Sequence, residues 1–447
     1  ETPVAEKFVG EALLIQNNCL TDSQGRTHMH LGVANQLLAR CMQYMGKSKR
    51  ALVFSEDALN IRVRTAPSMH HVDIVASKLI IADLMTEKGS MDKAKEKLKE
   101  CTKHLTVIFC ANNKYDQEAF GKCLLVSDYF VSLAGLCSAN GLYLHAKTLY
   151  SRAYAIRYRV LGPNHTKSVH ILCEAANNIR KPGYFLASQL TLSDIFEELK
   201  ENFAEQIPND HLFYITAMRY QALLQLDTHS YAEALSTLQN HCLKTLVANT
   251  NIMPQASGDQ TSQPLFNNNS IIATLYFDLG EYYRLTDNPS EALKTLTKCG
   301  DMRKELYGDK SIPVADVWHA KAMVLYSQNN MVQSLKFLKE LVLPVYETAF
   351  NGAKHPAIMN IKANIALCMN GQKRGSGQEM LDEISLFFDH FGQSPHTADH
   401  PWVLSLGGYA EPASKERISA NVTDTTLFTW SMPRFEGDEE YGAPLVL

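Results

Sequence analysis

Pairs of small residues that lie twelve positions apart recur along almost the whole chain. Two antiparallel helices joined by a short turn can approach closely only where each presents a small side chain at their crossing. Successive pairs are 42–46 residues apart, except for two longer steps of 52 and 58 residues, which indicate insertions. Such a period is typical of repeat proteins. The pairs are Ala39/Ala51, Ala82/Ala94, Ala134/Ala146, Ala176/Ser188, Ala222/Ala234, Gly280/Ala292, Ala322/Ser334 and, more weakly, Ala366/Gln378.

Apolar residues surround each pair at helical spacing, and turn-forming residues separate its two members. Around the first pair, Leu37, Leu38, Cys41 and Met45 form one apolar face of a helix. A single hairpin of two helices cannot bury such a face alone, so stacked hairpins must supply the core. The sequence therefore predicts an all-α solenoid of about eight helix hairpins. The turn-forming segments are residues 46–48, 89–90, 140–141, 181–183, 287–289 and 329–330.

Two neighbouring segments carry a resemblance to a known repeat family. Residues 150–157 read YSRAYAIR and residues 160–165 read VLGPNH. With the small-residue spacing, they resemble the second helix and linker of tetratricopeptide repeats of the kinesin light chain and nephrocystin type. The resemblance spans about residues 30–390 and implies a right-handed superhelix whose first helices line a concave groove for other proteins. The paired groove asparagines of that family are mostly absent, and only Asn364 occupies one of the two positions.

On this basis the chain divides into five segments. Residues 1–30 are expected to form an N-terminal helix or cap, residues 31–245 repeats one to five, and residues 271–391 repeats six to eight. Residues 246–270, rich in Asn, Gln and Ser, are predicted to be a surface loop. Residues 392–447 lose the helical period, so we expect an irregular tail that is either flexible or anchored in a groove by its aromatic residues. The candidate tail anchors are Trp402, Phe428, Trp430 and Phe435.

The phase of the repeat predicts which side chains face the groove. With the first small residue of each pair as the marker, the residues six and three positions before it, and one and four after it, point inward. Because guanidinium groups pair well with carboxylates, Arg180, Arg219 and Arg284 suggest a partner with acidic peptide segments, unless they are ordinary solvated arginines. The polar groove candidates are Gln36, Arg40, Gln43, Asp83, Asp128, His170, Asn177, Arg180, Arg219, Glu281, Arg284, Asp316, His319, Tyr326, Asn360 and Asn370.

The charge balance argues against nucleic acid and membranes as partners. The formal net charge is −4 and the pI is about 6.5, which provides no basic surface for phosphates. No apolar run approaches the roughly 18 residues of a bilayer span, and no signal peptide begins the sequence, so we expect a cytoplasmic protein. Residue 1 is Glu and not Met, so the sequence is compatible with a fragment of a longer protein. The ten cysteines contain no C-x-x-C pair and are predicted to be small core residues.

No motif for catalysis, phosphate binding or metal binding stands out. The chain lacks a G-x-x-x-x-G-K-[ST] loop, a G-x-S-x-G turn and an H-E-x-x-H helix. His396 and His400 have a metal-like spacing, but no third ligand lies at a recognisable interval, so we expect surface histidines. We therefore expect no catalytic residue, no cofactor and no metal.

These features favour a non-enzymatic scaffold for protein–protein interaction that is part of a larger assembly. The expected setting is a cytoskeletal one, in which the chain is a structural or adaptor component of a cilium, flagellum or microtubule complex. Two alternatives remain open. One is a motor cargo adaptor of the kinesin light chain type, and the other is a regulatory or scaffold part of a larger enzyme complex.

Overall fold

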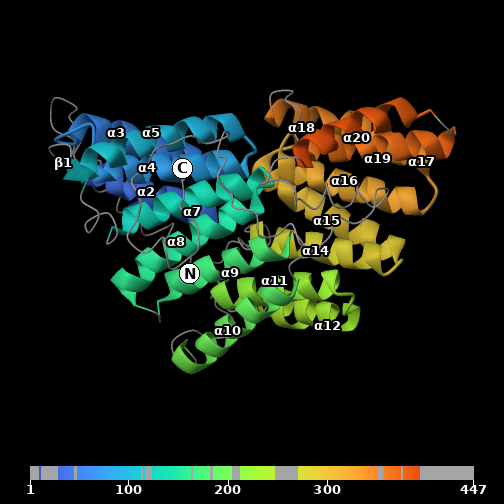
Figure 1. Ribbon diagram of the computed structural model, residues 1–447, viewed down its shortest axis with the longest axis horizontal. Coiled ribbons are helices and arrows are strands. Elements are labelled where there is room, and N and C mark those ends of the chain that lie inside the picture. Colours follow the sequence, from blue (N-terminus) through green and yellow to red (C-terminus); the bar gives the residue numbers. More distant parts are fainter. Residues whose placement is uncertain are drawn as a thin grey trace, which may run out of the picture.

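The computed structural model is a solenoid of helix hairpins (Figure 1). It describes residues 10–11, 29–44, 48–111, 114–115, 123–162, 165–181, 185–203, 212–246, 270–350, 356–373 and 376–392. Most of the predicted helix within residues 1–30 and most of the loop at 246–270 lie outside these ranges, as do His396, His400 and the tail anchors Trp402, Phe428, Trp430 and Phe435. The described helices pair into eight consecutive hairpins, as the sequence predicted.

The first four hairpins are α2 with α3, α4 with α5, α7 with α8, and α9 with α10. Their bounds are Met29–Tyr44, Ser48–Thr65, Val72–Glu87, Met91–Phe109, Leu124–Ala139, Tyr143–Leu161, Thr166–Arg180 and Phe185–Phe203. Two strands of two residues each, β1 (Cys110–Ala111) and β2 (Lys114–Tyr115), pair antiparallel after α5. Within the residues that the structure describes, every other regular element is a helix.

The second helices of the fifth and seventh hairpins are interrupted by short π-helical segments. The fifth hairpin is α11 with α12 and η1, the sixth α14 with α15, the seventh α16 with α17, η2 and α18, and the eighth α19 with α20. Their bounds are Leu212–Asp227, Tyr231–Ser236, Thr237–Leu243, Ser270–Leu285, Pro289–Tyr307, Ile312–Ser327, Met331–Phe337, Leu338–Val342, Leu343–Ala349, Pro356–Gln372 and Gln378–Gly392.

The small-residue pairs lie at the helix crossings, as the sequence predicted. Ala134 and Ala146, for example, are completely buried where α7 meets α8. Where a serine replaces the second alanine, its hydroxyl donates to the carbonyl of the first residue of the pair. The Oγ–O distance is 3.0 Å from Ser188 to Ala176 and 2.7 Å from Ser334 to Ala322. A buried hydroxyl is tolerated at the crossing because this bond satisfies it.

The eighth pair was predicted with the wrong second residue. Gln378 is exposed, and the residue that packs against Ala366 is Gly377, at a spacing of eleven. A Cβ at position 377 would lie 2.4 Å from the carbonyl oxygen of Ala366. The backbones approach here too closely for any side chain, and the Asn370 side chain accepts the Gly377 N–H at 2.7 Å.

Five hairpin turns share one backbone design. Each contains one residue with positive φ, followed by a residue whose N–H bonds to a carbonyl five positions earlier, as in Ser90 to Met85 at 2.8 Å. This is the Schellman arrangement, which satisfies carbonyl groups left unpaired at a helix end. The sequence predicted four of the five turns, and the fifth contains a histidine in the left-handed region. The positive-φ residues are Gly89, Gly141, His229, Asp287 and Asn329.

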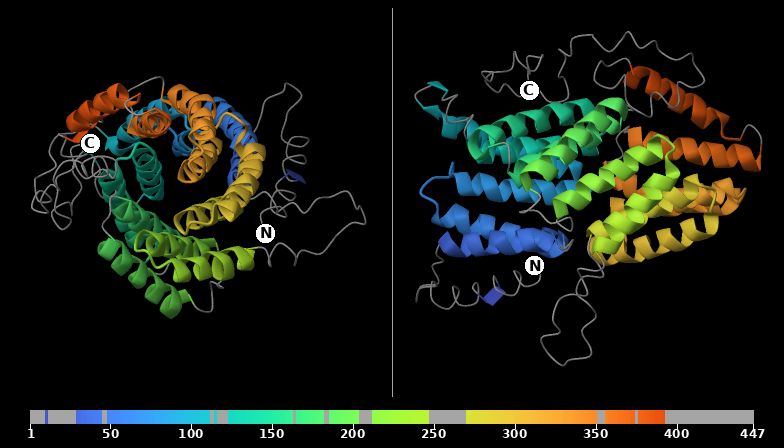
Figure 2. Two further views of the ribbon diagram at one scale, coloured as in Figure 1. Left: turned by 90° about the vertical axis from the view of Figure 1, so that its right-hand side faces the viewer. Right: turned by 90° about the horizontal axis from the view of Figure 1, so that it is seen from below.

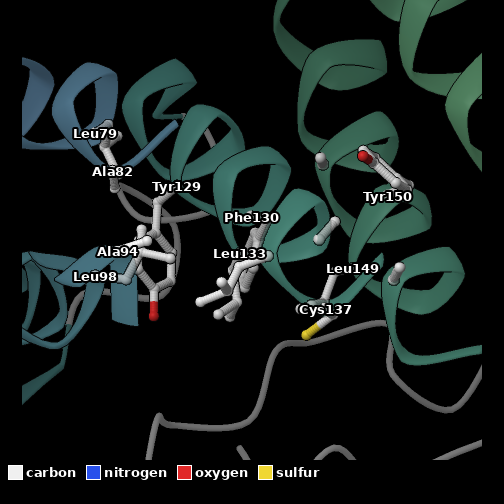
Figure 3. Packing of buried hydrophobic residues seen from close by; sticks show 14 of the residues in the cluster. Leu79, Ala82, Ala94, Leu98, Tyr129, Phe130, Leu133, Cys137, Leu149 and Tyr150 are labelled. Atoms are coloured by element: carbon white, nitrogen blue, oxygen red, sulfur yellow. The ribbon is translucent and has the colours of Figure 1, made fainter. Parts of the chain in front are cut away.

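The core runs between neighbouring hairpins. In Figure 3 the ring of Tyr129 lies beside Leu98, between the second and third hairpins, and both side chains are completely buried. The hydroxyl of Tyr129 forms a hydrogen bond of 2.8 Å with Thr102, so the phenol is buried without losing a polar partner. Each hairpin thus supplies one wall of the core of the next.

The superhelix curves until hairpins that are distant in sequence come into contact (Figure 2). The turn between α4 and α5 touches the start of α16, where a Cβ at Gly89 would lie 2.5 Å from Cδ1 of Ile312. Met91 belongs to the same buried apolar cluster as Phe350 and Ala357. We call this contact, formed by Gly89, Met91, Ile312, Phe350 and Ala357, the seam. The repeat pattern did not predict it.

The close approach at Gly377 predicts opposite effects for two glycine-to-alanine substitutions. Gly377→Ala should lower the free energy of unfolding by about 1–3 kcal/mol, because the new methyl group collides with the backbone of Ala366. Gly135→Ala, in the middle of α7 with no atom within 4 Å of the added Cβ, should raise it by about 0.5–1 kcal/mol. Urea denaturation followed by circular dichroism measures both. Equal effects of the two substitutions would contradict the crossing at Gly377.

Candidate functional site

Side chains predicted from the repeat phase converge on one cavity inside the superhelix. Arg40, Gln43, Asp83, Asp128 and His170 come from the first helices of the first four hairpins and line a cavity of ≈ 370 Å³. We call it the inner cavity. Further lining residues that the phase did not predict are Glu87, Ser132, Arg157, Ser270 and Ile271.

Carboxylates gather at the inner cavity. Asp128 accepts a hydrogen bond of 2.7 Å from Nη2 of Arg157. Asp83 is partly buried, and desolvation together with the nearby Glu87 and Asp128 charges raises its pKa to about 7, against the opposing hydrogen bond from Ser132. The pKa of Glu87 is also raised by desolvation, although its side chain still reaches water. Three carboxyl groups and two arginines therefore line the inner cavity.

The three arginines in the middle of the groove are paired with carboxylates of the chain itself. Arg180 in α9 binds Asp227 in α11, and also donates to Oδ1 of Asn177 at 3.1 and 3.3 Å. Arg219 in α11 binds Asp278 in α14 with Nε–Oδ2 and Nη2–Oδ1 distances of 2.5 and 3.2 Å. These two contacts link the first helices of successive hairpins. They help to fix the orientation of each hairpin relative to the next.

Arg284 differs, because its carboxylate lies on the same helix. Its Nη2 is 2.7 Å from Oε2 of Glu281, one helical turn earlier, and both side chains are partly exposed. An acidic partner would have to displace a carboxylate of the chain from each of these arginines. Asp227 and Asp278 were not among the predicted groove residues, since they fall outside the four chosen positions of the repeat.

A second cavity, of ≈ 390 Å³, lies at the seam, and we call it the seam pocket. The predicted residues Asp316, His319 and Asn360 line it, together with Glu87, which also lines the inner cavity. The Tyr346 hydroxyl donates to Asp316. The other lining residues are Thr86, Met91, Ala139, Ile312, Pro313, Tyr346, Phe350, Ala357 and Ile361.

The two groove histidines and Gln36 lie in different surroundings. His319 Nε2 lies 2.8 Å from Nδ2 of Asn364, which donates to it, and burial lowers the pKa of His319. Burial likewise lowers the pKa of His170. Gln36 is partly buried in α2 and lines neither cavity. The only position of the family's asparagine pairs that this chain keeps, Asn364, thus supports a groove histidine.

The cysteines described by the structure lie as the sequence predicted. Six of the eight are buried, and burial raises the pKa of the Cys101 and Cys137 thiols to about 12, which leaves them protonated and unreactive. Within the described ranges, no group of three or more His, Cys, Asp or Glu side chains could hold a metal ion. No helix in the described part of the chain has the length and apolar character to cross a bilayer.

Comparison with known proteins identifies the fold. No protein-family model matches the chain, and no curated protein matches it. Among solved structures, a Rap protein complexed with Competence and Sporulation Factor is 8% identical, with 86% of this chain and 99% of that chain covered and a TM-score of 0.53. This likeness places the chain among solenoids of tetratricopeptide-like repeats.

Two further solved structures match a smaller share of the chain. BtubC from P. vanneervenii is 14% identical, covers 56% of this chain and 91% of its own, and has a TM-score of 0.40. A kinesin light chain of Podosopora anserina with nearly identical TPR-like repeats is 17% identical, covers 52% of this chain and 99% of its own, and has a TM-score of 0.36.

The pair of Arg219 and Asp278 should contribute more stability than the pair of Arg284 and Glu281. Asp278 is 5% exposed, so Arg219→Met leaves a buried carboxylate without its cation and should cost about 3 kcal/mol of unfolding free energy. The matched substitution Arg284→Met removes a partly exposed pair within one helix and should cost about 0–1 kcal/mol. Chemical denaturation of both variants tests this order, and equal losses would contradict an inter-hairpin role for Arg219.

Asp83 should make the fold less stable as the pH rises from about 4 to about 7. A carboxyl group whose pKa is raised in the folded state favours folding while it is protonated, and that contribution is lost between about pH 4 and pH 7. Asp83→Asn should therefore raise the midpoint of thermal unfolding at pH 8 and leave it nearly unchanged at pH 4. Thermal melts at both values measure this difference. A variant that is equally shifted at both pH values would disprove the assignment to Asp83.

Proposed function

We propose that this tetratricopeptide-like solenoid is a non-enzymatic scaffold that holds a segment of another protein against its inner wall. The observation that carries the proposal is the convergence of polar side chains from four successive first helices on one cavity. Binding sites are typically concave and use a few well-placed polar groups to orient a ligand. Arg40 offers donors there, and Asp83 and Asp128 offer acceptors.

A binding role also agrees with the solved structure of similar fold. That Rap protein is complexed with Competence and Sporulation Factor, so a solenoid of this kind can hold a ligand. The present chain shares only the fold of that protein, and we propose only that its solenoid likewise holds a ligand.

The charge of the partner segment follows from the pairing of the groove arginines. Because Arg180 and Arg219 already bind Asp227 and Asp278, an acidic segment would gain little by exchanging one carboxylate for another. Arg284 is the most accessible of the three arginines and is the best remaining contact for an acidic group. We therefore propose that an acidic partner group binds at the part of the groove formed by α14.

For the cellular setting we propose a cytoskeletal assembly, such as a ciliary or microtubule-associated one. The near absence of the paired groove asparagines favours this setting, whereas the resemblance of residues 150–165 to kinesin light chain repeats supports motor cargo adaptation as the second candidate. Proximity labelling with the tagged chain in its native cell separates the two. Axonemal or microtubule-lattice proteins as neighbours support the first, whereas kinesin heavy chain and vesicle proteins support the second.

Site-specific photocross-linking tests the inner wall as the binding surface. The cross-linker p-benzoylphenylalanine is placed at Gln43 in the inner cavity and Asn360 in the seam pocket. The controls are two second-helix residues outside both cavities, the exposed Glu56 and the partly exposed Lys99. Irradiation in cell extract should produce the same adduct from both inner positions and none from the outer ones. Adducts formed only from Glu56 or Lys99 would overturn the proposal.

A further inference from the structure

We infer that the seam pocket receives a lysine or arginine side chain of the bound segment. This inference deepens the proposed function and rests on it, because it names the chemistry of one contact on the inner wall. The pocket measures ≈ 390 Å³, which is near the lower end of the range for ligand sites and leaves room for a long side chain.

The walls of the seam pocket are largely apolar and come from both sides of the seam. Met91 and Ala139 belong to the second and third hairpins, whereas Ile312, Phe350 and Ala357 belong to the last two. Apolar surface of this kind packs well against the methylene groups of a lysine or arginine stem. An uncharged apolar side chain would also fit these walls, so the polar groups must decide between the two.

Two carboxylates face the pocket, and their hydrogen-bond partners are neutral. Glu87 accepts from Nε2 of Gln43 at 2.7 Å and from the hydroxyl of Ser48 at 3.4 Å, and Asp316 accepts from the hydroxyl of Tyr346. None of the described lining residues is a lysine or arginine. His319, which lines the pocket too, has its pKa lowered by burial and therefore adds no charge near neutral pH.

The arginine whose charge acts on Asp316 is Arg303, and its guanidinium contacts other groups. Arg303 lowers the pKa of Asp316 through its charge, but its guanidinium donates to the carbonyl of Pro313 at 2.7 Å and lies 4.5 Å from the centre of the Phe277 ring. Burial nevertheless raises the pKa of Asp316 overall, and desolvation does the same for Glu87. Negative charge that is partly desolvated and incompletely offset is complementary to an incoming cation.

A side chain that fills the pocket would touch both sides of the seam. It would pack against Met91 from the second hairpin and Phe350 from the seventh, and its charged group would lie between Glu87 in α4 and Asp316 in α16. A ligand that contacts both sides stabilises the closed arrangement by its binding free energy. Binding of the partner should therefore stabilise the closed superhelix, and the closed superhelix should bind the partner more tightly.

Peptide selection with a matched charge control tests this inference. A random twelve-residue library displayed on phage is selected on the wild-type chain, and each selected peptide is synthesised in two forms, with its lysine or arginine retained or replaced by methionine. Binding is measured to wild type, to the double variant Glu87→Gln with Asp316→Asn, and to the control Asp57→Asn with Glu291→Gln. The control removes two charges outside both cavities, one from the exposed Asp57 and one from the partly exposed Glu291. Thermal melts establish that all three chains are folded.

Selected peptides should contain a recurring lysine or arginine, and its replacement by methionine should weaken binding to wild type and control by about 10- to 100-fold. The same replacement should change binding to the double variant Glu87→Gln with Asp316→Asn by less than about threefold, because the cation no longer has a carboxylate partner there. Peptides that cross-link to position 360 without a basic residue, or equal losses in all three chains, overturn the lysine or arginine inference while the scaffold function stands. Failure to select any peptide that cross-links at position 43 or 360 counts against both.

Discussion

The close crossing of two helices at paired small residues is the contact on which the rest of this structure depends. Where Ala134 meets Ala146, and where Gly377 meets the backbone of Ala366, the helices approach too closely for larger side chains. This approach sets the angle within each hairpin, and a constant angle repeated along the chain generates the superhelix. The inner wall and the seam are consequences of that curvature.

Charge pairs then adjust how successive hairpins lie against each other. Arg219 reaches from α11 to Asp278 in α14, across the long insertion, and Arg180 reaches from α9 to Asp227. Such contacts serve the fold and reduce the number of groove cations that a partner can use. The accessible chemistry of the inner wall is therefore more acidic than the count of groove arginines indicates, as the carboxylates of Asp83 and Glu87 illustrate.

The seam connects the binding of a partner with the shape of the superhelix. A groove that is open along its length could be occupied without any change in the solenoid, whereas a pocket that shares Met91 and Phe350 between distant hairpins couples occupancy to closure. The scaffold we propose is thus one in which binding and superhelical shape are connected through a few apolar contacts.

The sequence by itself determined the helix hairpins, their small-residue crossings and the inward phase of Arg40, Asp83, Asp128 and His170, because these depend on local spacing within one repeat. It predicted Gln378 in place of Gly377, since spacing alone cannot show which backbone approaches more closely. Only the tertiary structure decided that Arg180 and Arg219 are paired and that Gly89 meets Ile312. Those contacts join residues far apart in the chain, and their geometry follows from the accumulated rotation of many hairpins, which no single repeat encodes.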